Sequence, residues 1–479
     1  MSDRPLWTVA AMAQAMRAER VGMLPQSVPG LSIDTRTIAP GEAFFAIKGE
    51  ARDGHDFVPA ALKAGAGLAV VAADQRAAMP KDAPLIIVPN VLDALRDLAR
   101  AARGRTHAKV IGVTGSVGKT GTKEALWSAL AASGETHASV ASYNNHWGVP
   151  LSLARCPQTA RYAVFELGMN HAGEIEPLTC LVRPQVAIIT TVEPVHLEFF
   201  GSVEAIADAK AEIFLGIERG GAAIINRDNR QFARLERCAR SAGVERIVGF
   251  GEHARADARL IKSALHADCS TVQARILGTD VTYKLGAPGR HLVLNSLSVL
   301  AAVALAGADL ALAALALAGM TPARGRGART TLDLPGGAAL LIDESYNANP
   351  ASMRAALALL GQAAVSARGR RIAVVGDMLE LGPRGADLHR ALAEPVLAYG
   401  VDLVFCCGPL MAALWEALPS ERRGGYAETS SMLEPQVLAA IHPGDAVMVK
   451  GSLGSCMGPI VTAIERNYSR REATAAAQG

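Results

Sequence analysis

The feature that most constrains this fold is a glycine-rich stretch at residues 112–120, Gly-Val-Thr-Gly-Ser-Val-Gly-Lys-Thr. An apolar run leads into it and a helical pattern follows it, so we expect a strand, a glycine loop and a helix in that order. Such a loop directs backbone N–H groups and the positive end of a helix at one phosphate chain. Lys119 would supply a cation and the Thr120 hydroxyl a Mg²⁺ ligand, which predicts a nucleoside-triphosphate site.

The loop departs from the strict pattern G-x-x-x-x-G-K-[ST], because Val113 occupies the position of the first glycine. The glycines of the stretch are instead Gly112, Gly115 and Gly118. A glycine-rich turn with a surface lysine is therefore an alternative interpretation. The strand pattern before the loop and the helix pattern after it favour the phosphate site.

Composition limits the classes of partner. The chain has 479 residues, enough for about three domains of ordinary size. The formal net charge is only +3, aromatic residues make up 4%, and no basic block is interleaved with aromatics. Nucleic acid is therefore not expected as a partner.

Cysteines and apolar runs bear on location. The seven cysteines lack C-x-x-C spacing, which argues against a disulfide framework and a zinc site and favours a reducing cytoplasm. The first residues, Met-Ser-Asp-Arg-Pro, lack the design of a secretion signal. The longest apolar stretch, 297–320, contains Gly307 and Asp309, so we expect two buried helices there rather than a membrane span.

Strand and helix patterns divide the chain into three units. Residues 1–88 read as a small α/β unit, 89–322 repeat a strand-then-helix rhythm, and 323–479 form a third alternating unit. Strands that alternate with helices predict an α/β fold with mostly parallel sheets in the second and third units. The order of the strands cannot be read from the sequence.

Polar residues stand where several apolar runs end. Asp34-Thr35-Arg36 and Asp53-Gly54-His55 are loop positions that favour ligand contact, but surface turns look the same. In the second unit, Glu166 ends the run 162–165, and the loop after the run 186–191 carries Glu193, His196 and Glu198. Because the ligand crevice of a parallel sheet lies at the carboxyl ends of its strands, we expect Glu166 and His196 to converge with the glycine loop.

A lysine interrupts an apolar helix face. Ser202 is a capping residue, and the helix after it has a stripe at helical spacing made of Val203, Ile206, Ile213, Phe214 and Ile217. Lys210 lies inside this stripe. Its long stem could carry the ammonium to water, which is the ordinary explanation, or the lysine could have a functional role.

Taken together, these segments resemble the Mur ligases, ATP-dependent enzymes that add amino acids to the UDP-linked precursor of bacterial peptidoglycan. Six motifs in the family's order support this: Ile33-Asp34-Thr35-Arg36, Asp53-Gly54-His55-Asp56-Phe57, Tyr143-Asn144-Asn145 with Gly148-Val149-Pro150, Phe165-Glu166-Leu167-Gly168-Met169-Asn170, Glu344-Ser345-Tyr346-Asn347-Ala348-Asn349-Pro350 and Gly376-Asp377-Met378-Leu379-Glu380-Leu381-Gly382. The resemblance covers essentially the whole chain. Within the family, it is strongest to the branch that joins D-alanyl-D-alanine to a UDP-N-acetylmuramoyl-tripeptide.

The resemblance implies a domain plan and a set of ligands. It implies an N-terminal domain at 1–88 that binds the UDP precursor, a central P-loop ATPase at 89–322 and a C-terminal Rossmann-like ligase domain at 323–479. It also implies ATP, two Mg²⁺ ions and an acyl-phosphate intermediate. We expect a cytoplasmic monomer without a membrane span.

By position, the resemblance also assigns residues. Catalysis is assigned to Lys119, Lys210, His196 and Arg326, and metal binding to Thr120, Glu166, His196 and a carbamylated Lys210. Nucleotide contacts are assigned to Gly115, Ser116, Val117, Gly118, Lys119, Thr120, Asn295, Arg326 and one of Asp343 and Glu344. Substrate contacts are assigned to Asp34, Thr35, Arg36, Asp53, Gly54, His55, Asn144, Asn145, Tyr346 and Asn347.

Two positions depart from the family pattern, and three alternative functions remain. Leu292 stands where the family often has a second adenine-contacting asparagine, and Glu344 stands where the ribose-contacting acid is usually Asp, with Asp343 just before it. A diaminopimelate- or lysine-adding ligase of the family is one alternative. A regulatory or motor NTPase and a non-catalytic module derived from the ligases are the others.

Overall fold

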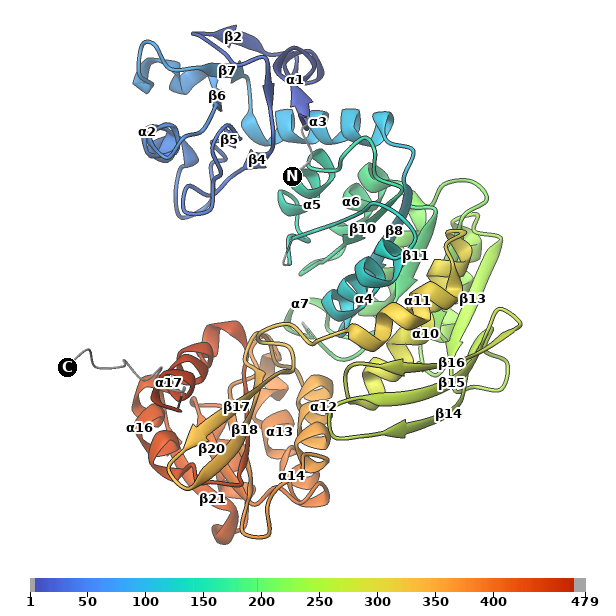
Figure 1. The fold of residues 1–479 in the computed structure, drawn as a ribbon, viewed down its shortest axis with the longest axis vertical. Coiled ribbons are helices and arrows are strands. Elements are labelled where there is room, and N and C mark those ends of the chain that lie inside the picture. Colours follow the sequence, from blue (N-terminus) through green and yellow to red (C-terminus); the bar gives the residue numbers. More distant parts are fainter. Residues whose placement is uncertain (1–4, 141, 196, 469–479) are drawn as a thin grey trace, which may run out of the picture.

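The computed structural model describes residues 5–140, 142–195 and 197–468. Within these residues, a five-stranded, a nine-stranded and a six-stranded sheet follow one another along the chain, and a two-stranded sheet lies near the start (Figure 1). Most strands of the three larger sheets pair in parallel and helices cover them, which confirms the predicted α/β class.

The five-stranded sheet has the order β2-β7-β6-β5-β4. Strands β4 to β7 pair in parallel, and β2 closes one edge in the antiparallel sense. Helix α3 then leads from this sheet to the glycine-loop strand and packs against α1 and α5. The elements are β1 (Trp7–Thr8), α1 (Val9–Met16), β2 (Glu19–Val21), β3 (Ser27–Val28), β4 (Leu31–Ser32), β5 (Ala43–Phe45), α2 (Val58–Lys63), β6 (Leu68–Ala72), β7 (Leu85–Val88) and α3 (Val91–Arg105).

The nine-stranded sheet has the order β16-β15-β14-β13-β12-β11-β8-β10-β9. Its strands pair in parallel from β9 to β14, and β14, β15 and β16 form an antiparallel meander. The strands are β8 (Lys109–Thr114), β9 (Thr136–Ala138), β10 (Tyr162–Glu166), β11 (Val186–Ile189), β12 (Ala222–Asn226), β13 (Arg246–Gly251), β14 (Ala258–Leu265), β15 (Ser270–Ile276) and β16 (Thr279–Leu285). Strand β8 lies between β10 and β11, so the chain changes direction across the sheet at the glycine loop, where such sheets bind ligands.

Helices of this unit cover the sheet. They are α4 (Lys119–Ala131), α5 (Gly148–Ala154), α6 (Ile175–Val182), α7 (Leu197–Phe200), α8 (Val203–Ala211), α9 (Phe232–Ser241), α10 (Arg290–Leu305) and α11 (Leu310–Ala316). The apolar stretch 297–320 is divided between α10 and α11, as predicted. Among the described residues, no helix has the length and hydropathy needed to cross a bilayer.

The six-stranded sheet has the order β17-β18-β22-β19-β20-β21. Strands β18 to β21 pair in parallel, and β17 is antiparallel to β18. The strands are β17 (Ala328–Leu334), β18 (Gly337–Glu344), β19 (Arg371–Gly376), β20 (Leu403–Cys407), β21 (Arg423–Ala427) and β22 (Ala446–Lys450). The helices are α12 (Pro350–Gly361), α13 (Gly385–Arg390), α14 (Ala393–Ala398), α15 (Ala412–Ala417), α16 (Ser430–Ala440) and α17 (Gly458–Tyr468).

Each face of this third sheet has its own core. On one face Ile342 and Met448 pack with Met353 of α12, and on the other Leu341 and Val447 pack with Ile460 of α17. The alternation follows from the two-residue period of a strand. The three larger sheets lie within 1–88, 89–322 and 323–479, while the boundaries of the predicted domains remain a prediction.

Candidate active site

The glycine loop packs tightly between the end of β11 and α10. Gly115 and Gly118 have φ of +149° and +87°, values that side-chain-bearing residues rarely adopt. A Cβ at Gly115 would lie 1.9 Å from Thr190 Oγ1, and one at Gly118 would lie 2.5 Å from Asn295 Nδ2. Both positions therefore require glycine. The loop ends where Lys119 begins α4, so the positive end of that helix faces the loop.

Two oxygen-bearing side chains meet beside the loop. Thr120 Oγ1 donates to Glu166 Oε2 at 2.8 Å, and Asn144 Nδ2 donates to Glu166 Oε1 at 2.8 Å. Glu166 is only 1% exposed, at the carboxyl end of β10. A hydroxyl and a carboxylate are hard ligands that suit Mg²⁺, which keeps several waters and binds phosphate oxygens besides.

No denser metal centre is present in the described part of the chain, since no group of three or more His, Cys, Asp or Glu residues could hold an ion there. A site with few protein ligands fits Mg²⁺ better than zinc. His196, the predicted ligand of a second ion, lies outside the described residues. Its role therefore stays a prediction.

A cavity of about 540 Å³ extends from the glycine loop to the carboxyl end of the third sheet. Its lining includes predicted nucleotide, metal and substrate residues from both units, although Gly115 and Lys210 are not among them: Ser116, Val117, Gly118, Lys119, Thr120, Asn144, Glu166, Asn295, Arg326, Glu344, Tyr346 and Asn347. The first residues of α12 complete one wall. The volume and the polar lining suit a nucleotide.

Arg326 connects the two walls. It precedes β17, and its Nη2 donates to Ser142 Oγ at 3.0 Å. Its guanidinium carbon lies 4.2 Å from the ring centroid of Tyr346, a cation–π contact that fixes the plane of the side chain. The loop after β9 is thus joined to the third unit.

Lys119 has a perturbed environment. Its Nζ donates to the Gly115 carbonyl at 2.7 Å. The pKa of Lys119 lies below its ordinary value, chiefly because burial disfavours the ammonium; Arg326 lowers the pKa further and Glu166 opposes the shift. A phosphate chain bound in the cavity would supply negative charge to pair with this ammonium.

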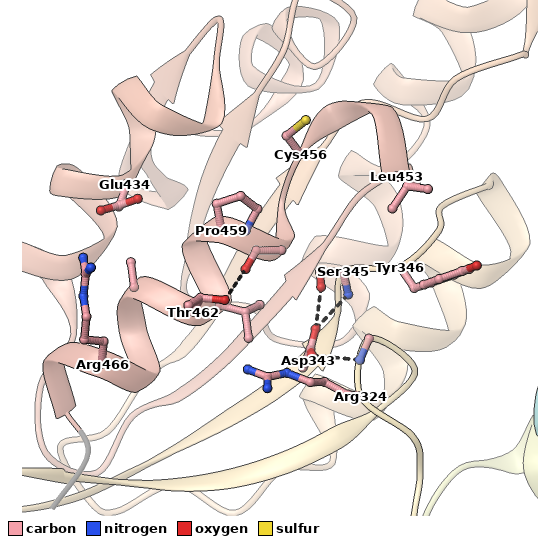
Figure 2. A pocket seen from close by; sticks show the side chains of 14 residues that line it. Arg324, Asp343, Ser345, Tyr346, Glu434, Leu453, Cys456, Pro459, Thr462 and Arg466 are labelled. Atoms are coloured by element: carbon pink, nitrogen blue, oxygen red, sulfur yellow. Dashed lines mark hydrogen bonds between the residues drawn. The ribbon is translucent and has the colours of Figure 1, made fainter. Parts of the chain in front are cut away.

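The adjacent acids Asp343 and Glu344 face opposite sides of the third sheet. Asp343 accepts from Gly325 N at 2.8 Å and from the Ser345 hydroxyl at 2.6 Å, on the α17 side (Figure 2). It lines a separate hollow of about 880 Å³ with Thr462 of α17. Glu344 lines the nucleotide cavity instead. Of the two carboxylates, only Glu344 is in a position to reach a nucleotide there.

Lys210 is buried, as its place in the apolar stripe predicted. It is 2% exposed and lies on α8 beside Ile206, Ala209 and Ile213 of the core. Its pKa lies well below the ordinary value because of burial, and the positive charge of Lys119 adds to the shift. With so little of the residue exposed, snorkelling to the protein surface does not account for this lysine.

The N-terminal polar clusters are paired within themselves. Arg36 Nη2 donates to Asp34 Oδ2 at 2.6 Å, and this partner holds the pKa of Asp34 below its ordinary value. His55 Nδ1 lies 2.6 Å from Asp53 Oδ1, and His55 Nε2 accepts from Ala72 N at 2.9 Å. These residues, with Thr35 and Gly54, do not line the nucleotide cavity, and their contact with substrate stays a prediction.

The predicted substrate residues near the cavity differ in their contacts. Asn145 accepts from Gly148 N at 2.9 Å at the start of α5 and does not line the cavity. Asn347 does line it, although its side chain already accepts from Ala348 N at 2.8 Å. Tyr346 lines both hollows and is 36% exposed.

Three ionisable residues of the cavity had not been assigned from the sequence. Lys450 ends the apolar strand β22, a position equivalent to that of Glu166 on β10, so strand-end reasoning could have found it. His291 lies one helical turn before Asn295 on α10, and burial lowers its pKa. Glu193, present in a predicted loop, also lines the cavity, and its pKa is raised by burial.

Comparison with known proteins agrees with this geometry. Residues 27–103 match the model described as Mur ligase family, catalytic domain, residues 113–303 the Mur ligase middle domain, and residues 332–453 the Mur ligase, glutamate ligase domain. The UDP-N-acetylmuramoyl-tripeptide–D-alanyl-D-alanine ligase of Escherichia coli is 34% identical over 92% of this chain and 94% of its own length. The enzyme of that name from Rickettsia prowazekii is 32% identical over 90% and 94%.

Solved structures give the same result over nearly the whole chain. MurF from Acinetobacter baumannii has a TM-score of 0.81 and 30% identity, and the alignment covers 96% of this chain and 99% of that one. MurF ligase from Thermotoga maritima in complex with ADP has a TM-score of 0.74 and 26% identity over 91% and 97%. This chain therefore belongs to the Mur ligase family.

Proposed function

We propose that this protein joins D-alanyl-D-alanine to a UDP-N-acetylmuramoyl-tripeptide at the expense of ATP, releasing ADP and phosphate. The observation that carries the proposal is its similarity, over nine-tenths of its length, to proteins that bear this activity as their name. The cavity supports it, because a phosphate loop and an oxygen-ligand pair lie against a second unit that could close over a nucleotide.

The chemistry requires activation of a carboxylate. A carboxylate oxygen of the tripeptide attacks the γ-phosphorus of ATP, the bond to the β–γ bridging oxygen breaks, and ADP leaves. Negative charge develops on the phosphoryl oxygens, and Lys119, Arg326 and the backbone N–H groups of the glycine loop are placed to stabilise it. The product is an acyl phosphate.

The dipeptide amine then attacks the acyl carbonyl. A C–N bond forms, the nitrogen loses a proton, and the C–O bond to phosphate breaks as the tetrahedral intermediate collapses. Water would compete with the amine, so closure of the third unit over the cavity favours ligation by excluding it. The Arg326–Ser142 contact is consistent with such a closed arrangement.

Residue roles in the nucleotide site follow from the cavity. We assign Asn295 to the adenine, Glu344 to the ribose and Arg326 to the γ-phosphate. Thr120 and Glu166 would hold Mg²⁺, which when bound neutralises charge on the phosphate oxygens. Asp343, whose carboxylate is already bonded to Gly325 and Ser345, is left to support the loop.

We further propose that Lys210 reacts with CO₂. The buried, neutral amine would add to the CO₂ carbon, forming an N–C bond with loss of one proton and giving a carbamate. Burial supports the proposal, since it depresses the pKa of Lys210 and so supplies the nucleophilic free amine. Two carbamate oxygens would then suit a hard cation such as a second Mg²⁺ ion.

We assign the UDP end of the precursor to the N-terminal unit at Asp34, Thr35, Arg36, Asp53, Gly54 and His55. In support, Arg36 interacts electrostatically with the central unit. Its pKa is raised mainly by the hydrogen bond with Asp34, with a smaller electrostatic contribution from Tyr143 of the Tyr143-Asn144-Asn145 motif.

The seven cysteines, all unpaired in the structure, support a cytoplasmic location. A monomer remains a prediction that sedimentation would test.

The deciding experiment is an acceptor and donor screen with purified protein. We expect ATP-dependent phosphate release only when a UDP-muramoyl-tripeptide and D-alanyl-D-alanine are both present. Equal turnover with a single amino acid and a shorter peptide precursor would assign the chain to another branch of the family. Release of phosphate without any amine would instead indicate a regulatory NTPase.

A further inference from the structure

Lys450 is a buried lysine in the wall of the nucleotide cavity. The residue is 2% exposed and stands at the carboxyl end of β22, in the middle of the third sheet. Its Nζ donates to Glu344 Oε2 at 3.2 Å and to the Asn347 carbonyl at 2.9 Å. A buried ammonium is costly unless its charge is paired, so this pairing is the first clue to its role.

The sheet register brings the two side chains together. Strands β18 and β22 pair in parallel with Glu344 opposite Lys450. Residues opposite each other in a parallel pair project from the same face, which here is the α12 face that carries Ile342 and Met448. The backbone therefore directs both side chains into the cavity.

The ammonium engages only one oxygen of the carboxylate. Glu344 Oε2 is bonded to Lys450, which leaves Oε1 available to accept from a ligand hydroxyl. The second bond, to the Asn347 carbonyl, fixes the segment that leads from Glu344 into α12. Across the cavity, His291 of α10 interacts electrostatically with both partners, and Glu344 raises while Lys450 lowers the pKa of this histidine.

We propose that Lys450 is a positioning residue of the nucleotide site, which holds the Glu344 carboxylate turned toward the ribose hydroxyls. This inference rests on the proposed contact between Glu344 and ribose. Lys450 itself acts through Glu344 and need not touch the nucleotide. Without the ammonium, the carboxylate would stand in the cavity wall with no hydrogen-bonded countercharge to fix its rotamer.

The test is discrimination between ATP and its 2′-deoxy and 3′-deoxy analogues. It is measured as the ratio of the KM of each analogue to the KM of ATP, with saturating acceptor and donor. The corresponding diphosphates are compared by calorimetry. A hydrogen bond from a ribose hydroxyl to a charged acceptor predicts about tenfold to a hundredfold weaker binding of the more affected analogue by the unaltered protein. Glu344→Gln and Lys450→Met should each reduce this ratio to within about threefold of one. The double variant should resemble each single variant, since both single changes disrupt the same contact between Glu344 and the ribose.

Conservative variants separate positioning from folding. Lys450→Arg keeps the charge and should retain most of the discrimination, whereas Lys450→Gln keeps a donor without the charge and should lose most of it. Lys450→Gln also replaces Lys450→Met if the latter does not fold. The control is Lys123→Met, which removes another buried lysine, one that is bonded to the Ser139 carbonyl, paired with Glu124 and not part of the cavity lining. It should alter stability and leave the ratio unchanged.

The outcomes are distinct. A normal ratio in both neutral Lys450 variants, with lower stability or with affinity for all nucleotides reduced equally, would overturn the proposal in favour of a scaffold role or a direct phosphate contact. A normal ratio in Glu344→Gln would show that Glu344 does not contact ribose, which removes the assignment on which the inference depends. If Glu344→Gln no longer discriminates between the nucleotides while the Lys450 variants still do, only the role of Lys450 is rejected.

Discussion

The nucleotide cavity and the N-terminal polar clusters contain similar residue types held in different ways. In the cavity, Thr120 bonds Glu166 over a separation of 46 residues, and Arg326 bonds Ser142 over 184. In the N-terminal unit, Asp34 bonds Arg36 and Asp53 bonds His55, each over 2 residues. Contacts over 2 residues also stabilise ordinary turns, whereas contacts between segments far apart in the sequence exist only because the fold creates them.

Exposure follows the same division. In the cavity Glu166 and Lys450 are 1% and 2% exposed, while the Arg36 side chain in the N-terminal unit is 86% exposed. Buried charges that are not fully paired within the protein are costly, so their presence favours a ligand that pairs with them. Exposed pairs contribute little to stability. We therefore expect changes in the cavity to act on nucleotide binding and rate, and changes in the clusters to act on stability and precursor affinity.

The largest effect is expected for Lys210→Ala, which should abolish ligation because the carbamate would be lost. Short-chain carboxylates such as acetate should restore part of the activity by occupying the vacated space. Nuclear magnetic resonance of the unaltered protein in labelled bicarbonate should show a carbamate carbon that the variant lacks. Near-normal turnover with a modest loss of stability would reject the carbamate.

Next is Lys119→Ala, which removes a cation beside the transferring phosphoryl group. Loss of such a preorganised contact lowers kcat by about 10² to 10³, and the folded state should be retained because the ammonium is bonded only to a loop carbonyl. Carboxylates should not rescue this variant, which makes it the matched control for Lys210→Ala. Wild-type turnover in a purified, folded sample would mean that the phosphate site has been misplaced.

The smallest effect is expected for Asp53→Asn. Partial burial alone would raise the Asp53 pKa, but bonds from the backbone N–H and the ring of His55 outweigh it, so the pKa lies below 3.8. A lowered carboxyl pKa adds stability above the unfolded value, and that stability is lost as pH falls through the folded value. We expect the variant to lose up to about 1 kcal/mol of unfolding free energy at pH 7 and nothing at pH values below the folded pKa.

Urea titrations across this pH range would check that expectation, with Asp56→Asn, an exposed neighbour, as the control. Turnover of Asp53→Asn at saturating precursor should equal that of the unaltered protein. A fall in kcat comparable to that of Lys119→Ala would show that the N-terminal clusters take part in the chemistry. The division between the two regions would then be wrong.

Local patterns predicted the parts of the site that local chemistry determines. The glycine loop, Lys119 and Thr120 follow from a strand, a run of glycines and a helix start, and Glu166 follows from its place at a strand end. The burial of Lys210 was readable because helical periodicity places it among Ile206 and Ile213.

The sequence could not predict which face of the third sheet meets the nucleotide, nor the order of the strands. Alternation implies that Asp343 and Glu344 point in opposite directions, but which direction meets the nucleotide depends on whether α12 or α17 covers a given face. The antiparallel meander of β14 to β16 was also hidden, because alternating strands arise in either orientation. Lys450 belongs to the cavity only because β22 is inserted between β18 and β19.

The contact of Arg326 with Ser142 has a thermodynamic consequence. Since the cavity takes one wall from each of two units, nucleotide affinity and the free energy of bringing those units together are linked and reciprocal. If bound nucleotide raises the equilibrium constant for closure by some factor, closure raises the affinity for nucleotide by the same factor. A small molecule that wedges the two units apart at Ser142 would therefore weaken ATP binding without entering the phosphate loop.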